Sequence, residues 1–509
     1  MAPTPRPGHH TENSSDGAED KLEFQDLKVM ELHDEDAKGW KYRGEGAANI
    51  VLAYHGNRPS FIGRVLRIRK ASEHDSGMHI RSRKDSKPIL SEDERKLWRE
   101  CPNMSMATTS AALEHLYASE IMQPLLGKEN VDAGLLVFLN TGFLEAVNEN
   151  VVAKQPEWRR KDAKMDTTGR VALLIADHSS FHNMAGKVRG LPQTITIELK
   201  PKWGCLPTAA TISEENIVKR HVSRFAMHQH LKFQQGKVKS LSKYSPLDLF
   251  SGNVEGIHKA LVALFETPQN NVRVFLKGEE IFGGSENIGS TDEEIMTLEE
   301  KLAAVSVAPE GERIPGFQRL VASALNESKV LDRLLSVQKQ DAYDIEGAIL
   351  AYNKFVGMTD DAAADDCTEA RSETSPSLDP DIVSTTLALE TEGEQKEGDQ
   401  AWIKSLSWEE SRAVVRDFLI AATAKNCCLM VTLRPLHNRH GTAFPLPSAS
   451  LATCPTTGQQ YIFKVSFLNL DTKRLKKMPF YHSLDQQIVN AYKACSKQPA
   501  EQLCDVSST

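Results

Sequence analysis

Hydrophobic and polar positions repeat with two different periods along the chain, which predicts a mixture of strands and helices. Residues 194–204 (TITIELKPKWG) alternate sharply, and apolar runs at 171–181, 427–435 and 461–470 predict further strands. Residues 40–70 predict two strands with turn residues at 56–59 (GNRP). Apolar residues at helical spacing predict helices over 110–125, 216–237, 250–266, 329–356, 408–426 and 484–495. We therefore expect an α+β fold of two lobes joined near residues 170–180.

Charge and composition divide the 509 residues into ordered and polar segments. Residues 359–400 hold 13 acidic residues against two basic ones, a net charge of −11, whereas the whole chain carries −8. The remainder is therefore slightly basic, at +3, and the overall acidity does not exclude an anionic ligand. This stretch is typical of a solvated linker, although an acidic decoy for the protein's own basic site is the alternative.

These patterns give an expected domain plan. We expect a disordered N-terminal tail over residues 1–36, an N-terminal lobe over 37–177, a C-terminal lobe over 178–500 with a disordered acidic insert at 359–401, and a tail over 501–509.

The cysteines and the apolar runs bound the cellular context. The chain has eight cysteines with neither a CxxC pair nor zinc-finger spacing, so we expect reduced thiols rather than a disulfide scaffold. No apolar run reaches the roughly 18 residues that would suggest a membrane span, and the N-terminus lacks the apolar region of a secretory signal. We expect a cytoplasmic or nuclear protein.

The strongest local signal is the run ELKPK at residues 198–202. Side chains two apart in a strand share a face, so Glu198, Lys200 and Lys202 are predicted to project together while the intervening apolar residues pack on the other face. Two lysines beside one carboxylate suit a polyanion. The alternative is a solvated strand face with an ion pair. The proline within the run predicts that this strand end is not fully paired.

A second signal is the small-residue run GEGAAN at residues 44–49. Small residues between two strands allow backbone amides to approach phosphates, as in the glycine-rich loops of protein kinases. Arg67, on the following strand, would be the natural phosphate partner. An ordinary hairpin turn explains the same run, so the loop alone does not decide the function.

Basic residues cluster at Lys473, Arg474, Lys476 and Lys477, followed by Tyr481. Such a cluster could be a nucleic-acid patch, a phosphate clamp or the soluble end of a helix. No aromatic platform or nucleic-acid motif accompanies it, so we expect no nucleic-acid partner. The single histidines at 178 and 228 are equally consistent with structural hydrogen bonds.

Longer stretches resemble a known family. They include YRGEGAANIVLAY, LWRE, PLLGKENVDAG, ADHSSF, IELKPKWGCLPT, VSRFAMHQHLK, YSPLDLFSG, TPQNNVRVFL, VLDRLL, DIEGAI, LIAATAK and LDQQIVNAY. Between about Glu31 and Tyr492, apart from the acidic insert, the sequence is similar to the inositol-pentakisphosphate 2-kinases of the plant type. The Glu-x-Lys-Pro-Lys motif is a hallmark of that family.

The resemblance implies a fold and a reaction. It implies a distant protein-kinase-like fold with a small N-terminal lobe and an enlarged C-terminal lobe. It also implies transfer of the ATP γ-phosphoryl group, with Mg²⁺, to the 2-hydroxyl of inositol 1,3,4,5,6-pentakisphosphate, which gives the hexakisphosphate (phytate). The partners expected are ATP and the inositol phosphate, with no membrane, and the chain is expected to be a monomer.

The resemblance also implies site residues by position. The nucleotide would contact Arg43, Gly46, Ala47, Ala48, Asn49, Arg67, Asp177, His178, Glu198 and Arg273. The inositol phosphate would contact Arg159, Lys200, Lys202, Lys232, Asn270, Lys473, Lys477 and Tyr481, with His228 nearby. Several cations are needed to replace the water shell of a substrate with five phosphates.

The sequence departs from the family pattern at the metal site. Asn426 and Asn469 stand where the family has aspartates that bind metal, the first of them also the expected base. Asparagine can ligate Mg²⁺ through its carbonyl oxygen, but it cannot act as a general base. Asp471, two residues beyond Asn469, is the candidate replacement.

Three further departures are smaller. The plant-type zinc site is missing, because Leu350 replaces its histidine and the insert holds only Cys367. Ser72 replaces a substrate-contacting arginine, for which Arg69 or Lys70 could substitute. Ala176 replaces a hinge asparagine, a loss that backbone groups binding adenine could offset.

Two functions of different class follow. The first is an inositol-pentakisphosphate 2-kinase that uses Mg-ATP. The second is a pseudokinase that binds inositol phosphates without efficient transfer, which the asparagines favour. A third hypothesis, nucleic-acid binding through residues 473–477, predicts steeply salt-dependent affinity for DNA or RNA.

Overall fold

A computed structural model describes residues 30–46, 48–71, 87–155, 164–181, 193–283, 290–360, 402, 405–436 and 450–496. These residues form a mixed α/β structure with two six-stranded sheets. Several predictions lie outside the described residues: those on Ala47, Ser72, Arg159, Cys367, the acidic insert beyond Asp360 and the C-terminal tail.

The first sheet has the strand order β1-β5-β6-β4-β3-β2. Its strands are β1 (Met30–Leu32), β2 (Trp40–Glu45), β3 (Asn49–Tyr54), β4 (Arg64–Arg69), β5 (Leu135–Leu139) and β6 (Val171–Ala176). β1 runs parallel to β5, and the other pairs are antiparallel. The prediction of two strands over residues 40–70 was wrong, because this segment forms three strands. The small-residue run at 44–49 separates β2 from β3, and β4 follows.

The N-terminal boundary also needs correction. Residues 30–36, predicted to belong to the disordered tail, form β1 and the start of the 3₁₀ helix η1 (Asp34–Gly39). Leu32 and Ala37 are buried in the core of the first sheet, which explains why this segment is ordered.

The second sheet is antiparallel, with the order β11-β12-β10-β7-β8-β9. Its strands are β7 (Ile195–Leu199), β8 (Val272–Leu276), β9 (Glu279–Phe282), β10 (Cys428–Pro435), β11 (Ser450–Thr453) and β12 (Gln460–Leu468). The strands predicted at 427–435 and 461–470 are therefore confirmed, whereas only residues 195–199 of the strand predicted at 194–204 form β7.

Helices before β7 are α1 (Glu92–Leu97), α2 (Pro102–Ser105), α3 (Ser110–Leu116), the π-helical turn η2 (Tyr117–Met122), α4 (Gln123–Leu126) and α5 (Thr141–Lys154). Later helices are η4 (Glu214–Arg220), α7 (Arg224–Gln234), α8 (Pro246–Leu249), α9 (Val254–Glu266), α10 (Asp292–Leu302), α11 (Arg313–Ser328), α12 (Val330–Gln338), α13 (Asp344–Asp360), α15 (Trp408–Asn426), η5 (Leu475–Lys477) and α16 (Met478–Ser496). The helices predicted at 216–237 and 329–356 are each broken in two.

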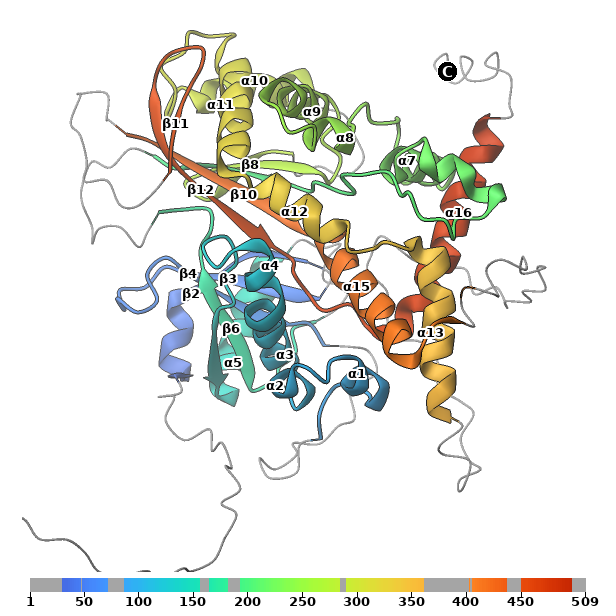
Figure 1. Cartoon of the computed structure of the whole chain (residues 1–509). Helices are drawn as coiled ribbons and strands as arrows, with labels where there is room; N and C mark the ends of the chain where they lie inside the picture. Colours follow the sequence, from blue (N-terminus) through green and yellow to red (C-terminus); the bar gives the residue numbers. More distant parts are fainter. Residues whose placement is uncertain are drawn as a thin grey trace, which may run out of the picture.

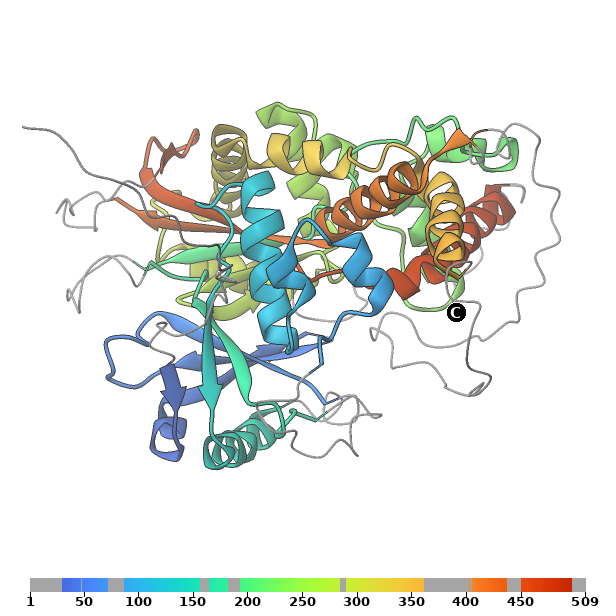
Figure 2. The ribbon, with the colours of Figure 1, turned by 60° about the horizontal axis from the view of Figure 1, so that its bottom comes forward.

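Two large hydrophobic cores and two smaller clusters hold these elements. The first sheet packs with α5 around one core, and the second sheet packs with α9 to α13, α15 and also α1 to α4 around a larger one. Residues 90–133 therefore belong by packing to the larger core, although they precede β5 in the chain. Figure 1 shows the second sheet above the first, and Figure 2 shows α13, α15 and α16 gathered away from the first sheet.

Candidate active site

Several of the predicted site residues lie at one edge of the second sheet. Leu199 at the end of β7 lies opposite both Val272 at the start of β8 and Leu429 near the start of β10. Cys428, in turn, lies opposite Leu468 at the end of β12. Because the pairs are antiparallel, these four strand ends share one edge. We call residues 198–202, 270–273, 426–428 and 469–473 the site edge.

The ELKPK run reaches the site edge at the end of β7. Ile195, Ile197 and Leu199 are fully buried, as the alternation predicts. The strand ends at Leu199, and Lys202 adopts a left-handed backbone with φ of 62°. Strand periodicity therefore does not extend to Lys202, so the placement of Lys202 in the strand was wrong, although Glu198, Lys200 and Lys202 all act on the pKa of Cys428. The chain turns after the proline, and this turn places Lys202.

Glu198, Arg273 and Asn270 lie together across β7 and β8. Glu198 pairs with Arg273 in the strand register, and Arg273 donates from Nη2 to Asn270 Oδ1 at 3.4 Å. Arg273 Nε also lies 3.9 Å from Glu280 Oε2. Burial raises the pKa of Glu280, Arg273 opposes this, and Glu198 adds to it. Asn270 and Glu280 thus both contact the Arg273 guanidinium, beside Glu198 on the neighbouring strand.

Positive charge surrounds His228 on α7. Burial lowers the pKa of His228 well below its usual value, and the cations of Lys232, Arg224 and Lys202 lower it further. The imidazole is therefore neutral near pH 7. Two of the lysines predicted to bind the inositol phosphate, Lys202 and Lys232, therefore lie near His228.

Part of the basic connector, residues 473–477, is fixed by contacts with α1. Arg474 forms an ion pair with Glu94 of α1 at 3.4 Å, and the Leu475 amide donates to the same carboxylate. Lys477 ends η5, and Tyr481 lies in the first turns of α16, with its ring centroid 6.3 Å from that of Phe418. These contacts hold the connector in place, which is more typical of an ordered side of a binding site than of an open nucleic-acid patch.

The hinge residues join the two sheets. The hydroxyl of Ser179 accepts from Arg43 Nη2 at 2.9 Å, and the Ser179 amide donates to Asp177 Oδ1 at 2.9 Å. The carbonyl of His178 accepts from the hydroxyl of Thr432 on β10. Burial and the nearby Lys464 cation lower the pKa of His178 to about 4, so its ring is neutral at pH 7.

The backbone amides at Ala176 and Asp177, at and next to the position of the missing hinge asparagine, are already used within the protein. The Ala176 amide donates to Asp132 Oδ2 at 2.7 Å, and the next amide, of Asp177, donates to the Gly63 carbonyl at 2.8 Å. Adenine therefore cannot use these two amides without displacing a protein acceptor, which narrows the expected backbone contacts to the rest of the hinge.

The small-residue run at 44–49 leaves open space beside its backbone at Gly46. The Gly46 amide donates to the Asn49 carbonyl at 2.9 Å, and a Cβ added at Gly46 would meet no heavy atom within 4 Å. Ala48 and the buried Asn49 continue the turn into β3. Lys70, one candidate replacement for the arginine missing at position 72, is instead buried in an ion pair with Glu45 at 2.5 Å.

Arg67 links the first sheet to the site edge. Its Nη2 lies 3.1 Å from Asp471 Oδ1 and 3.7 Å from Glu114 Oε2. Although burial opposes ionisation of Asp471, the cations of Arg67 and Lys473 lower its pKa. Burial, with Asp471 next in strength, raises the pKa of Glu114 to about 7. The arrangement keeps Asp471 ionised and leaves the Glu114 carboxyl partly protonated near pH 7.

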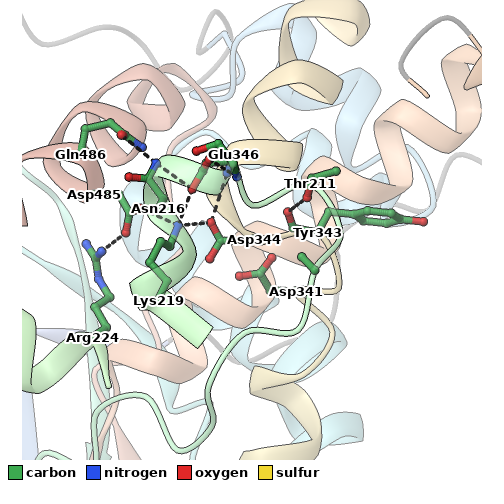
Figure 3. Close-up of polar contacts among 12 residues, drawn as sticks. Thr211, Asn216, Lys219, Arg224, Asp341, Tyr343, Asp344, Glu346, Asp485 and Gln486 are labelled. Carbon is green, nitrogen blue, oxygen red and sulfur yellow. Dashed lines mark hydrogen bonds and ion pairs between the residues drawn. The ribbon is translucent and has the colours of Figure 1, made fainter. Parts of the chain in front are cut away.

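A buried ionic cluster links η4, α7, α13 and α16 (Figure 3). The Lys219 ammonium contacts Asp344, Glu346 and Asp485, at 3.1 Å for Glu346 and 2.7 Å for Asp485. Asp485 on α16 also accepts from Arg224 on α7. The three carboxylates are spaced closely enough for a metal ion, but the lysine ammonium already lies among them. Their role is to hold α7, α13 and α16 together.

Comparison with known proteins identifies the family. A family model described as inositol-pentakisphosphate 2-kinase matches residues 42–487. The chain belongs to the inositol-pentakisphosphate 2-kinase family. The inositol-pentakisphosphate 2-kinase of Arabidopsis thaliana is 38% identical over 474 residues, covering 93% of this chain and 96% of the relative. That of Oryza sativa subsp. indica is 37% identical over 461 residues (91% and 95% covered), and that of Danio rerio 28% over 533 residues (92% and 96%).

The family predicted from the motifs is thereby confirmed. None of the helices in the described part of the chain is long and apolar enough to cross a membrane. In an inositol-pentakisphosphate 2-kinase, Asn426 and Asn469 stand at positions expected to bind the metal, so their surroundings bear on catalysis.

Asn426 and Asn469 lie at the same end of the β10–β12 ladder. Asn426 ends α15 and donates from Nδ2 to the Ala422 carbonyl at 2.9 Å, while Asn469 Nδ2 donates to Cys428 Sγ at 3.0 Å. The carbonyl oxygen is thus the atom of each side chain that could ligate a metal. Asn469 has φ of 58°, a backbone that asparagine tolerates better than most residues.

These donors fit Mg²⁺ in kind but not in charge. Mg²⁺ takes oxygen ligands, and two amide oxygens with one carboxylate satisfy that preference. The neutral amides supply no negative charge, so Asp471 is the one ionised candidate among the three. An inositol-pentakisphosphate 2-kinase built this way would hold the metal mainly through Asp471 and the nucleotide phosphates.

Several residues at this site escaped the sequence reasoning. Glu114 comes from a segment predicted only as a helix, and Asp132 and Ser179 stand in stretches that carried the family resemblance without being predicted as site residues. Their partners lie far away in sequence, so no local spacing signals them. The polar residues in otherwise apolar stretches were the available hint.

Proposed function

We propose that this protein transfers the γ-phosphoryl group of ATP to the 2-hydroxyl of inositol 1,3,4,5,6-pentakisphosphate. Membership of the kinase family supports the reaction class, and the meeting of Lys200, Lys202 and the two asparagines at one sheet edge supports its location. That juxtaposition of anion-binding and metal-binding groups is the observation that carries the proposal.

The nucleotide binds between the two sheets in this proposal. The open backbone around Gly46 faces the phosphates, Arg67 meets their charge from β4, and the hinge from Asp177 to Ser179 holds the adenosine with Glu198 and Arg273. This arrangement corresponds to a distantly kinase-like pair of lobes, with the first sheet as the smaller lobe. Mg²⁺, when bound, would neutralise charge on the transferring phosphates.

The inositol phosphate binds on the far side of the site edge. Lys200, Lys202 and Lys232 approach from β7 and α7, and Lys473, Lys477 and Tyr481 approach from the connector and α16. Asn270 adds a polar contact from the start of β8. Holding the ring at several phosphates aligns one hydroxyl with the γ-phosphorus, and such positioning supplies much of the rate in phosphoryl transfer.

The chemistry of the described residues limits the rate of this step. Asn426 occupies the position of the expected base and cannot accept the hydroxyl proton. Asp471 is ionised but paired with Arg67, so it acts as a base only if the nucleotide phosphates take Arg67 from it. We expect slow but real turnover in a monomeric cytoplasmic or nuclear protein.

The second candidate function is inositol-phosphate binding without transfer. The observation that favours it is the pair of neutral amides at Asn426 and Asn469, which removes two negative charges from the metal site relative to the family pattern. The lysines of the site edge serve either function equally.

A time course decides between the two. Purified protein is incubated with Mg-ATP and inositol pentakisphosphate, and the products are resolved by anion-exchange chromatography. Hexakisphosphate accumulating over many turnovers supports the kinase. No product, together with calorimetric binding of the inositol phosphate, supports the binding protein, and no binding at all contradicts both.

A further inference from the structure

A buried amide lies behind the site edge. Gln338, the last residue of α12, is fully buried in the larger core. Its Nε2 donates to the Lys202 carbonyl at 2.8 Å and to the Ala424 carbonyl at 3.3 Å, while its Oε1 accepts from the Gly204 amide at 2.8 Å. One side chain therefore uses both of its donors and its acceptor on backbone groups of two different segments.

The first of these segments carries Lys202 in its left-handed conformation. Such a backbone is unfavourable for a residue with a Cβ and persists where the surroundings fix it. The peptide plane after Lys202 is held by Gln338, and the plane before it is held by the buried Tyr244, whose hydroxyl donates to the Pro201 carbonyl at 2.8 Å. The two planes define the φ and ψ of Lys202, so two buried side chains set its direction.

The second segment is the C-terminal end of α15. The last carbonyls of a helix have no partner within the helix. Gln338 satisfies the carbonyl of Ala424, two residues before Asn426. The same two segments meet again at Trp203, whose ring lies 4.0 Å from Lys425 Nζ and 4.7 Å from Arg224 Cζ. Lys425 is itself held by Asp341 at 2.6 Å.

We propose that Gln338 is a positioning residue that, with Tyr244, holds Lys202 and the Asn426 end of α15 in register. The inference rests on the proposed function, because it takes Lys202 as a contact of the inositol phosphate. Gln338 touches neither substrate. It acts by fixing the distance between the lysine that anchors the inositol phosphate and the helix end next to the transferring phosphate.

Binding of inositol hexakisphosphate, measured by calorimetry in the full-length protein, tests the proposal. Gln338→Met keeps the volume but removes the hydrogen bonds, and it should weaken binding by about tenfold or more, since buried backbone groups lose their partners. ATP affinity should change little. Gln318→Met, at a buried glutamine of α11 in the part of the larger core remote from the site edge, is the matched control and should leave both affinities near wild type.

Two further variants keep the test informative if Gln338→Met does not fold. Tyr244→Phe removes one hydroxyl and should weaken the same binding while preserving the ring. Gln338→Glu should bind poorly at pH 8, where a carboxylate faces two carbonyls, and recover part of its affinity relative to wild type near pH 6 as the buried acid gains a proton and a donor. Absence of such recovery would show that the lost hydrogen bonds are not what weakens binding and would overturn the positioning role.

The outcomes separate the inference from the proposed function. If wild type fails to bind the hexakisphosphate, the proposed function itself is wrong. If wild type binds and Lys202→Ala weakens binding, but Gln338→Met and Tyr244→Phe bind as wild type does, the positioning role is overturned alone. Equal losses in Gln318→Met and Gln338→Met would also overturn it.

Discussion

Arg67 Nη2 on the first sheet lies 3.1 Å from Asp471 Oδ1 at the end of the second, so one ion pair spans the two sheets at the proposed nucleotide site. The pair joins a predicted phosphate ligand to the one ionised candidate for the metal. Phosphates that attract Arg67 would release Asp471 toward the metal, and this couples nucleotide binding to metal binding.

The first prediction concerns Asp471. Asp471→Asn leaves three neutral amides as the metal donors, so we expect the affinity for Mg-ATP to fall by about tenfold or more. Calorimetric titration with ATP at several Mg²⁺ concentrations measures this. Asp332→Asn, at an exposed carboxylate beside Lys329, is the matched control. An unchanged dependence on Mg²⁺ would show that Asp471 is not the metal ligand.

The second prediction concerns the missing base. Asn426→Asp restores both a charge and a proton acceptor, so turnover should rise by about tenfold or more, because general bases contribute about 10²–10⁴-fold. Affinity for the inositol phosphate should stay close to wild type. Asn326→Asp on α11 makes the same change elsewhere and should leave the rate alone. If Asn426→Asp changes nothing in a slow or inactive protein, the lost carboxylate does not explain the deficit.

The third prediction separates Lys202 from its backbone conformation. Lys202→Ala removes a charge-assisted contact, and inositol hexakisphosphate should bind about tenfold more weakly or worse. Lys329→Ala is a close control, because Lys329 also adopts a left-handed backbone, with φ of 56°, but lies exposed between α11 and α12. Equal affinities for the two variants would argue against Lys202 as a substrate contact.

The fourth prediction concerns the ionic cluster in Figure 3. Burial raises the pKa of Asp344 to about 6, against 3.8 as its ordinary value. The folded protein therefore holds a proton that the unfolded chain has released between these values, and this group makes the free energy of unfolding fall as pH rises from about 4 to about 6. Asp344→Asn should flatten that part of the profile in urea unfolding, and an unaltered slope would contradict the assignment.

The fifth prediction removes the cation of that cluster. Lys219→Met leaves Asp344, Glu346 and Asp485 without their shared ammonium, and we expect a loss of about 3–5 kcal/mol in the free energy of unfolding. Urea denaturation measures the loss. Lys259→Met, at an exposed lysine paired with Asp248 at 3.1 Å, should cost much less. Similar costs at both positions would mean that the cluster does not hold the helices.

Local pattern predicted the strands because their apolar positions are buried. Ile195, Ile197 and Leu199 are buried as their spacing requires, and the apolar run of β10 is buried along its length. The break between α12 and α13 was not predicted, although residues 339–343 (KQDAY) are mostly polar; in the structure Asp344 takes a left-handed backbone there.

Site residues could be assigned from the sequence, but the contacts among them could not. The family resemblance assigns Lys202 to the inositol phosphate and Arg67 to the nucleotide, yet the contacts that fix them involve Gln338 and Asp471, which are distant in sequence. Contacts between residues this far apart in the sequence produce no periodic pattern, so a single sequence does not reveal them. The left-handed turn at Lys202 likewise depends on buried partners rather than on the residue itself.

A crystal structure with inositol pentakisphosphate, Mg²⁺ and a non-hydrolysable ATP analogue tests the central claim most directly. The account predicts that the inositol ring lies against Lys200 and Lys202, with its 2-hydroxyl directed at the γ-phosphate beside Asn426 and Asp471. An inositol phosphate bound away from the site edge, or a metal held without Asp471 or either asparagine, would contradict it.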